Sequence, residues 1–169
     1  YLTEAAEVPV WKISFNGDAP TFRIESQLKI QQKYQVLNVA DFCNECGNCT
    51  TFCPTKGSPF SDKPRICLTE KSFHQTDNSF LFQQEDNTSI LLHRTGEEVS
   101  RLSKTHHSYQ FSNSRVNVSF SAADFSITMA ETSGTALAEI ILSEAAEMKI
   151  LLDTIHYTFL KTQHHDTKN

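Results

Sequence analysis

Four of the five cysteines in this 169-residue chain fall within eleven consecutive positions. They are Cys43, Cys46, Cys49 and Cys53. Their spacing, C-x2-C-x2-C-x3-C with Pro54 directly after, is that of loops that hold [4Fe–4S] clusters through thiolates. Two intervening residues let successive side chains reach different irons, and Gly47 suits a backbone that needs positive φ or a close approach. The run therefore predicts an iron–sulfur site whose potential is set partly by N–H groups pointing at the sulfurs.

The fourth ligand of such a cluster stays open. In two-cluster proteins the last cysteine of the run ligates the other cluster, and this chain contains one run. Either Cys53 or Cys67 completes a single cluster within the chain, or the chain is a piece of a larger protein with a second run. Cys67 can equally be a small buried hydrophobe on a strand.

Residues 43–64, CNECGNCTTFCPTKGSPFSDKP, resemble the ferredoxin-type segment of the selenate-reductase-like subunit family. Its members are flavin and iron–sulfur oxidoreductases related to the glutamate synthase small subunit and to dihydropyrimidine dehydrogenase. The resemblance implies one-electron transfer within, or as a subunit of, a larger flavin-dependent oxidoreductase. That family carries a further cysteine run shortly upstream, whereas residues 1–42 here contain no cysteine.

Substrate chemistry is not expected in the chain itself, and no catalytic residue is predicted. Neither G-x-G-x-x-G for a dinucleotide nor G-x-x-x-x-G-K-[ST] for a nucleotide phosphate occurs. FAD and NAD(P)H would accordingly belong to a partner flavoprotein or to a missing domain.

Two other functions are compatible with the cysteines. The main alternative is a non-redox interaction module with a structural zinc site, although such sites use two separated C-x2-4-C pairs and not one run. A cluster kept as an oxygen or iron sensor is a third possibility, but nothing resembles a DNA-binding or catalytic output.

Composition and charge limit the partners. The net charge is −5 and no basic stripe is present, so nucleic acid is not an expected partner. No stretch has the ~20 apolar residues of a membrane helix, and no signal peptide is recognisable. Thiols that must stay reduced indicate the cytoplasm. The chain begins at Tyr1 without an initiator Met, which suggests a processed chain or a segment of a longer one. Basic residues beside the cysteines are expected to form a solvated loop: Lys56, Lys63 and Arg65.

Hydrophobic patterning predicts an α+β fold with mainly antiparallel β structure and a long C-terminal helix. The first strand, with a register change after Val10, should end at the turn 16–18. Further strands are expected at 21–24, 28–39, 66–73, 79–83, 89–94, 109–111, 116–120 and 125–129, with a hairpin turn at 86–87. Trp11 and Tyr34 should be core or half-buried residues, and His106 and His107 should lie in a surface loop.

The C-terminal helix is expected over 136–161, started by Ser133 or Thr135 as the cap. Apolar residues at helical spacing should form one face that covers the sheet: Leu137, Ile140, Ile141, Ala145, Met148, Leu151, Leu152, Ile155 and Phe159. The expected organisation is a β segment with the iron–sulfur loop at 1–65, an antiparallel block at 66–130, and the helix with its tail at 131–169.

Overall fold

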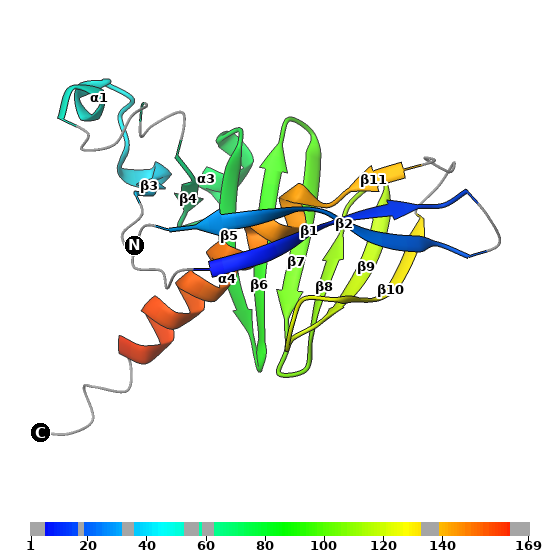
Figure 1. The fold of residues 1–169 in the computed structure, drawn as a ribbon. Coiled ribbons are helices and arrows are strands. Elements are labelled where there is room, and N and C mark those ends of the chain that lie inside the picture. Colours follow the sequence, from blue (N-terminus) through cyan, green and yellow to red (C-terminus); the bar gives the residue numbers. More distant parts are fainter. Residues whose placement is uncertain are drawn as a thin grey trace, which may run out of the picture.

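The computed structural model describes residues 6–16, 19–31, 36–52, 58, 63–132 and 139–162. Within these residues the strands form a small sheet of order β11-β1-β2 and a large sheet of order β10-β9-β8-β7-β6-β5-β4-β3 (Figure 1). The small sheet contains β1 (Ala6–Ser14), β2 (Thr21–Ile30) and β11 (Glu139–Ile141). The large sheet contains β3 (Asn38–Val39), β4 (Arg65–Cys67), β5 (Ser79–Glu85), β6 (Thr88–Thr95), β7 (Glu98–Lys104), β8 (Ser108–Ser112), β9 (Val116–Ser121) and β10 (Ile127–Thr132). The helices are η1 (Ala40–Phe42), α1 (Asn48–Phe52), α3 (Glu70–Gln75) and α4 (Ser143–Thr162).

Most neighbouring strands are antiparallel, while β3, β4 and β5 pair in parallel at one edge of the large sheet. The α+β prediction with mainly antiparallel strands is thus confirmed at this level. Figure 1 shows the β1–β2 ribbon crossing the face of the large sheet. Helix α4 contacts β1 and β2 on one side and β6 and β7 on the other, so it covers the sheet as expected.

The first strand has the predicted register change, between Val10 and Trp11 in its pairing with β2. Trp11 is half-buried, as expected, and its Nε1 donates a hydrogen bond to the Phe125 carbonyl oxygen at 2.8 Å. Strand β2 runs unbroken over Thr21–Ile30, where two separate extended segments were predicted. Gly17, Asp18 and residues 32–35, Tyr34 among them, lie outside the described residues.

The strand predicted over 66–73 is wrong beyond Cys67, because a helix follows. The Thr69 hydroxyl accepts a hydrogen bond from Ser72 N–H at 3.1 Å, and Ser72 Oγ accepts one from Thr69 N–H at 3.4 Å. This reciprocal pair is a capping box, which satisfies orphan donors at a helix start. Phe73 of α3 is buried against Cys67 and Leu81 in a small satellite core.

The meander β5–β9 contains the strands predicted at 79–83, 89–94, 109–111 and 116–120, and the turn at 86–87. It also contains β7, which has no strong sequence signal because its buried positions include Ser100 and Ser103. The strand expected over 125–129 runs over Ile127–Thr132 instead. Phe125 precedes it with a φ of 57° and stacks on Phe120 at a centroid distance of 4.1 Å.

The helix prediction is wrong at its start, because residues 139–141 form β11 and pair with β1. Ile140 is buried in that pairing, while Ile141 is 52% exposed. Later members of the expected face are all buried: Ala145, Met148, Leu151, Leu152 and Ile155. Ser133, Thr135 and Leu137 lie outside the described residues, and the side chain of Phe159 is not described.

One hydrophobic core joins the two sheets and α4, and it contains residues from each of the three segments set out above. The segment boundaries at 65 and 130 stay predictions. His106 and His107 are exposed in the loop between β7 and β8, as expected. No helix within the described residues is long and apolar enough to cross a membrane.

A partly buried ion network ties α4 to the large sheet. Asp153 Oδ1 accepts hydrogen bonds from Lys104 Nζ of β7 and from the Tyr109 hydroxyl of β8, both at 2.6 Å. Its Oδ2 accepts from Lys149 Nζ at 2.8 Å. Burial alone would raise the pKa of Asp153, but the two ammonium groups and the hydroxyl hold that pKa below its usual value. The carboxylate therefore stabilises the fold in its ionised form.

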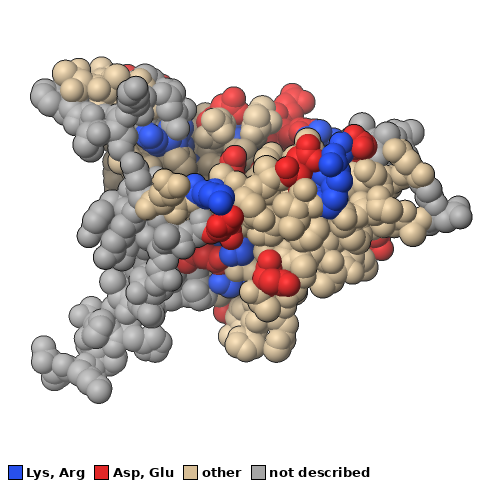
Figure 2. Space-filling model, in the orientation of Figure 1, with Lys and Arg blue, Asp and Glu red and all other residues tan. Residues whose placement is uncertain are grey.

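Charged side chains of both signs alternate over the small sheet (Figure 2). Lys12 pairs with Glu139 at 2.5 Å, and Lys29 with Glu7 at 2.9 Å. Lys29 and Glu7 are both exposed, and an exposed pair of this kind contributes little to stability.

Candidate functional site

The cysteine loop is attached to the parallel edge of the large sheet. Strand β3 pairs with β4, with Asn38 opposite Arg65 and Val39 opposite Ile66. The Asn38 backbone N–H donates to the Pro64 carbonyl oxygen at 2.8 Å. The chain then enters η1 and the segment 43–52, which we call the ligand loop. Figure 1 shows α1 of this loop standing away from the two sheets.

Asp41, in η1, fastens the start of the ligand loop to the β4–α3 junction. Its Oδ2 accepts hydrogen bonds from the Leu68 N–H at 2.8 Å and from the Ser72 hydroxyl at 3.1 Å. The Leu68 N–H is the main cause of the lowered pKa of Asp41, with help from Ser72. A charged acceptor strengthens both hydrogen bonds. Asp41 therefore holds the start of the ligand loop against the β4–α3 junction.

Replacing Asp41 with Ala should release this anchor. We expect the Leu68 amide proton to exchange faster with solvent, because it loses the acceptor that protects it. Hydrogen exchange read by NMR measures this directly. The matched control is Asp77→Ala, which removes the acceptor of the Gly96 N–H at 2.6 Å and should leave Leu68 unchanged. Equal exchange at Leu68 in wild type and Asp41→Ala would contradict the anchoring role.

The backbone of the ligand loop turns at two residues with positive φ, Glu45 at 54° and Gly47 at 76°. A Cβ at Gly47 would meet nothing within 4 Å, so the glycine is needed for its φ and not for space. The Asn44 side-chain oxygen accepts the Cys46 N–H at 3.3 Å. These turns place the backbone of the first three cysteines on one short, tightly curved segment.

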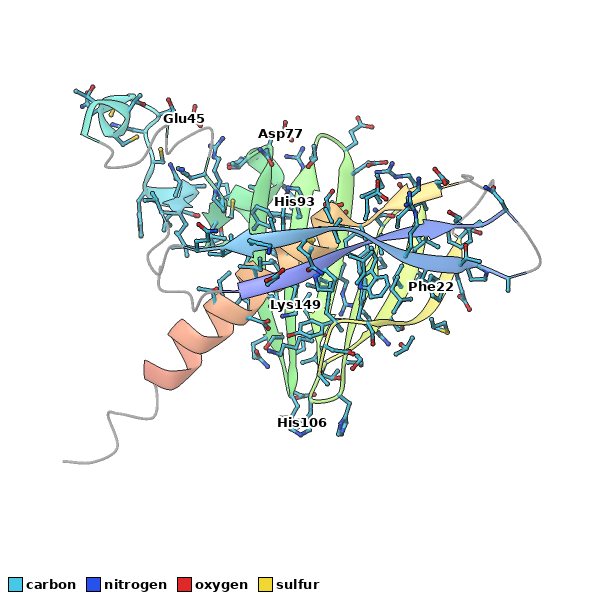
Figure 3. The ribbon with its side chains drawn as sticks, in the orientation of Figure 1. Phe22, Glu45, Asp77, His93, His106 and Lys149 are labelled. Carbon is cyan, nitrogen blue, oxygen red and sulfur yellow. The ribbon has the colours of Figure 1, made fainter. Side chains whose placement is uncertain are left out.

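Glu45 also pairs with Arg65 of β4, whose Nη2 lies 2.6 Å from Glu45 Oε1. Figure 3 shows Glu45 at the end of the molecule opposite to Phe22. Arg65 was expected in a solvated loop, but it begins β4, and its side chain is only 18% exposed. Lys63 is half-buried, and Lys56 lies outside the described residues.

The predicted ligands lie at different depths. Cys43 is half-buried, Cys46 and Cys49 are exposed, and all three are free thiols. Cys49 lies in α1. Cys67 is a free thiol 2% exposed, packed in the satellite core with Phe73 and Leu81. Cys53 lies outside the described residues.

No three His, Cys, Asp or Glu side chains of the described segments gather closely enough to hold a metal. The ligand loop thus carries Cys43, Cys46 and Cys49 within seven consecutive residues, without gathering three possible metal ligands in the described part of the chain. The donor set nevertheless fits an iron–sulfur cluster, since soft thiolates are its usual ligands. Metal sites commonly form together with the metal, so exposed thiols are compatible with such a site.

Two side chains that contact the ligand loop or hold it in place, those of Asn38 and Asp41, were not predicted from the sequence. The Asn38 side chain donates from Nδ2 to Cys43 Sγ at 3.3 Å, and Asp41 anchors the loop as described. No motif marks either residue, since their roles come from contacts with the folded loop and the β4–α3 junction. Phe42, between Asp41 and the first cysteine, is 82% exposed.

Comparison with known proteins relates part of the chain to one curated protein. Over 48 residues, 28% of the chain, it is 40% identical to "Putative oxidoreductase YgfK" of Escherichia coli strain K12. The protein of that name from E. coli O157:H7 matches with the same identity over the same length. The matched segment amounts to 5% of the length of these curated relatives. No family model matches the chain, and no solved structure matches it with significance.

Proposed function

We propose that this chain is an iron–sulfur electron-transfer module of a larger flavin-dependent oxidoreductase of the selenate-reductase-like kind. The observation that carries the proposal is the ligand loop, which carries three free thiols within seven consecutive residues directly after the edge strand β3. The similarity of a 48-residue segment to the protein named "Putative oxidoreductase YgfK" supports a redox role.

In this proposal Cys43, Cys46 and Cys49 hold a [4Fe–4S] cluster. When bound, such a cluster accepts and releases single electrons. The chain's own residues would hold the cluster, shield one side of it and donate hydrogen bonds to its sulfur ligands. FAD and NAD(P)H, if used, would bind a partner flavoprotein or another part of a longer polypeptide.

The fourth ligand in this proposal is Cys53 and not Cys67. Cys67 is buried on β4 between Phe73 and Leu81, in apolar surroundings where a small side chain contributes packing. Reaching a cluster would require the Cys67 thiol to leave this core.

Metal analysis of wild type and Cys67→Ala, prepared anaerobically, tests the proposal. We expect about four iron and four acid-labile sulfide per chain in both proteins, the stoichiometry of one cubane. Cys67→Ala should lose about 1 kcal/mol of folding free energy, a typical cost of a core substitution. A cluster lost with Cys67 would assign that thiol as the fourth ligand, and one zinc without iron would reject the redox function.

A further inference from the structure

The Asn38 side chain is a hydrogen-bond donor aimed at a cluster ligand from outside the ligand loop. Its Nδ2 lies 3.3 Å from Cys43 Sγ. Cys43 is also the least exposed of the three cysteines that the structure describes in the ligand loop. The contact therefore forms on the side of the loop that faces the protein body, where water competes least for the sulfur.

The strand, and not the loop, positions this donor. Asn38 is a β3 residue paired with Arg65 of β4, and its backbone N–H is fixed by the Pro64 carbonyl oxygen at 2.8 Å. Only five positions separate it from Cys43. Its amide can thus stay in place while the exposed part of the ligand loop rearranges around a metal.

The Asn38 amide is a costly group to bury at this position. Its Oδ1 is buried without a hydrogen-bond partner among the described residues, and a buried unsatisfied oxygen destabilises a fold. A residue retained only for packing would avoid this cost with an apolar side chain of similar shape. Among the described residues, the hydrogen bond that this side chain makes is the one from Nδ2 to the sulfur.

We propose that Asn38 is a positioning residue that raises the reduction potential of the cluster by donating to Cys43, an inference that rests on the proposed function. One-electron reduction adds negative charge that is shared by the cluster and its thiolates, with no bond broken and no proton required. An N–H donor to a thiolate is stronger when the sulfur carries more charge, so it favours the reduced state. Removing the donor should make reduction harder.

The test is a redox titration of the cluster-loaded chain with dithionite as reductant and mediators, read by the EPR signal of the reduced cluster. Asn38→Leu removes the donor while keeping the approximate shape of the side chain. We expect the ratio of reduced to oxidised cluster at a fixed potential to fall about fivefold, the net effect of one hydrogen bond. For a one-electron couple this is a shift of about 40 mV to more negative potential, at 59 mV per tenfold change. Asn48→Leu, the same substitution at an exposed position of the ligand loop, should leave the potential unchanged.

The outcomes separate this inference from the function on which it rests. Equal potentials in loaded wild type and Asn38→Leu would overturn the role of Asn38 and leave the electron-transfer function intact. A wild-type chain that binds no iron–sulfur cluster would overturn both. If Asn38→Leu fails to fold or to load, Asn38→Asp takes its place, since it keeps the shape and replaces the donor with a negative acceptor. Its potential should fall at least as far, and an unchanged or higher value would reject the proposal.

Discussion

Cys46→Ser should leave the chain folded and unable to hold its cluster. Cys46 is the middle one of the three cysteines of the ligand loop, and a serine oxygen is a poor substitute for a thiolate toward iron. We expect iron and sulfide to fall from about four of each per chain to a small residue, with loss of the visible absorbance of the loaded protein. Because Cys46 is exposed, the free energy of unfolding of the metal-free chain should change by no more than about 0.5 kcal/mol.

The matched control for Cys46→Ser is Thr51→Ala, at an exposed position in the helical turn of the same loop. It should bind iron and sulfide as wild type does, so that loss in Cys46→Ser reports ligation and not a disturbed loop. Wild-type iron content in Cys46→Ser would contradict the assignment of this run as the cluster site.

Asp153→Asn should cost about 2 kcal/mol of folding free energy. Removing one partner of a buried ion pair costs about 3–5 kcal/mol, and the value here is lower because the Asp153 side chain is still 30% exposed. The variant removes the negative charge that Lys104 and Lys149 share, and both ammonium groups lie near the Tyr109 ring, at 5.3 and 5.4 Å from its centroid. Urea unfolding of both proteins at pH 7 measures the difference as a lower midpoint.

The advantage of wild type over Asp153→Asn should also depend on pH in one direction. The folded-state pKa of Asp153 is lowered, so its carboxylate binds protons less readily in the folded than in the unfolded chain. Its contribution is therefore complete above the unfolded pKa, about 3.9, and is lost as pH falls through the lower folded value. Midpoints at pH 7 and pH 5 should differ equally between the two proteins, and the difference should shrink below pH 4. A difference that grows on acidification would refute the network as described. Asp86→Asn, at an exposed carboxylate in the turn between β5 and β6, is the control and should give the same difference from wild type at each pH.

The cysteine spacing could be recognised from sequence because the chemistry of a cluster loop is local: its ligands come from one short run. The register change after Val10 was also visible, since two apolar residues in succession break a period of two. Asn38 and Asp41 could not be found in this way. The bonds of Asp41 to Leu68 and Ser72 cross 27 and 31 positions, and they exist only after β4 and α3 have been placed.

Errors in the predicted elements have similar causes. The run from Glu139 to Ile141 continues the helical spacing of the residues after it, and only the pairing with β1 makes it a strand. The strand predicted over 66–73 ends before Thr69, because the Thr69 hydroxyl accepts a hydrogen bond from the Ser72 N–H and caps a helix there. Hydrophobic patterning does not detect a polar contact of this kind. Strand β7 was missed because serines occupy its buried positions, where a pattern search expects apolar residues.

The pairing of β1 with β11 has a consequence for the order of folding. It joins the two ends of the described fold: Ser14 contacts Glu139 across 125 positions. Contacts so distant in sequence form late, because the entropy of closing the intervening chain must first be overcome. The β1–β2 hairpin is made before β11 and α4 during synthesis, and its buried residues Val8, Val10 and Ile13 share one core with Ile140 of β11 and with α4. Until β11 and α4 have been made, this part of the core is incomplete, and the apolar side chains that it leaves exposed favour aggregation.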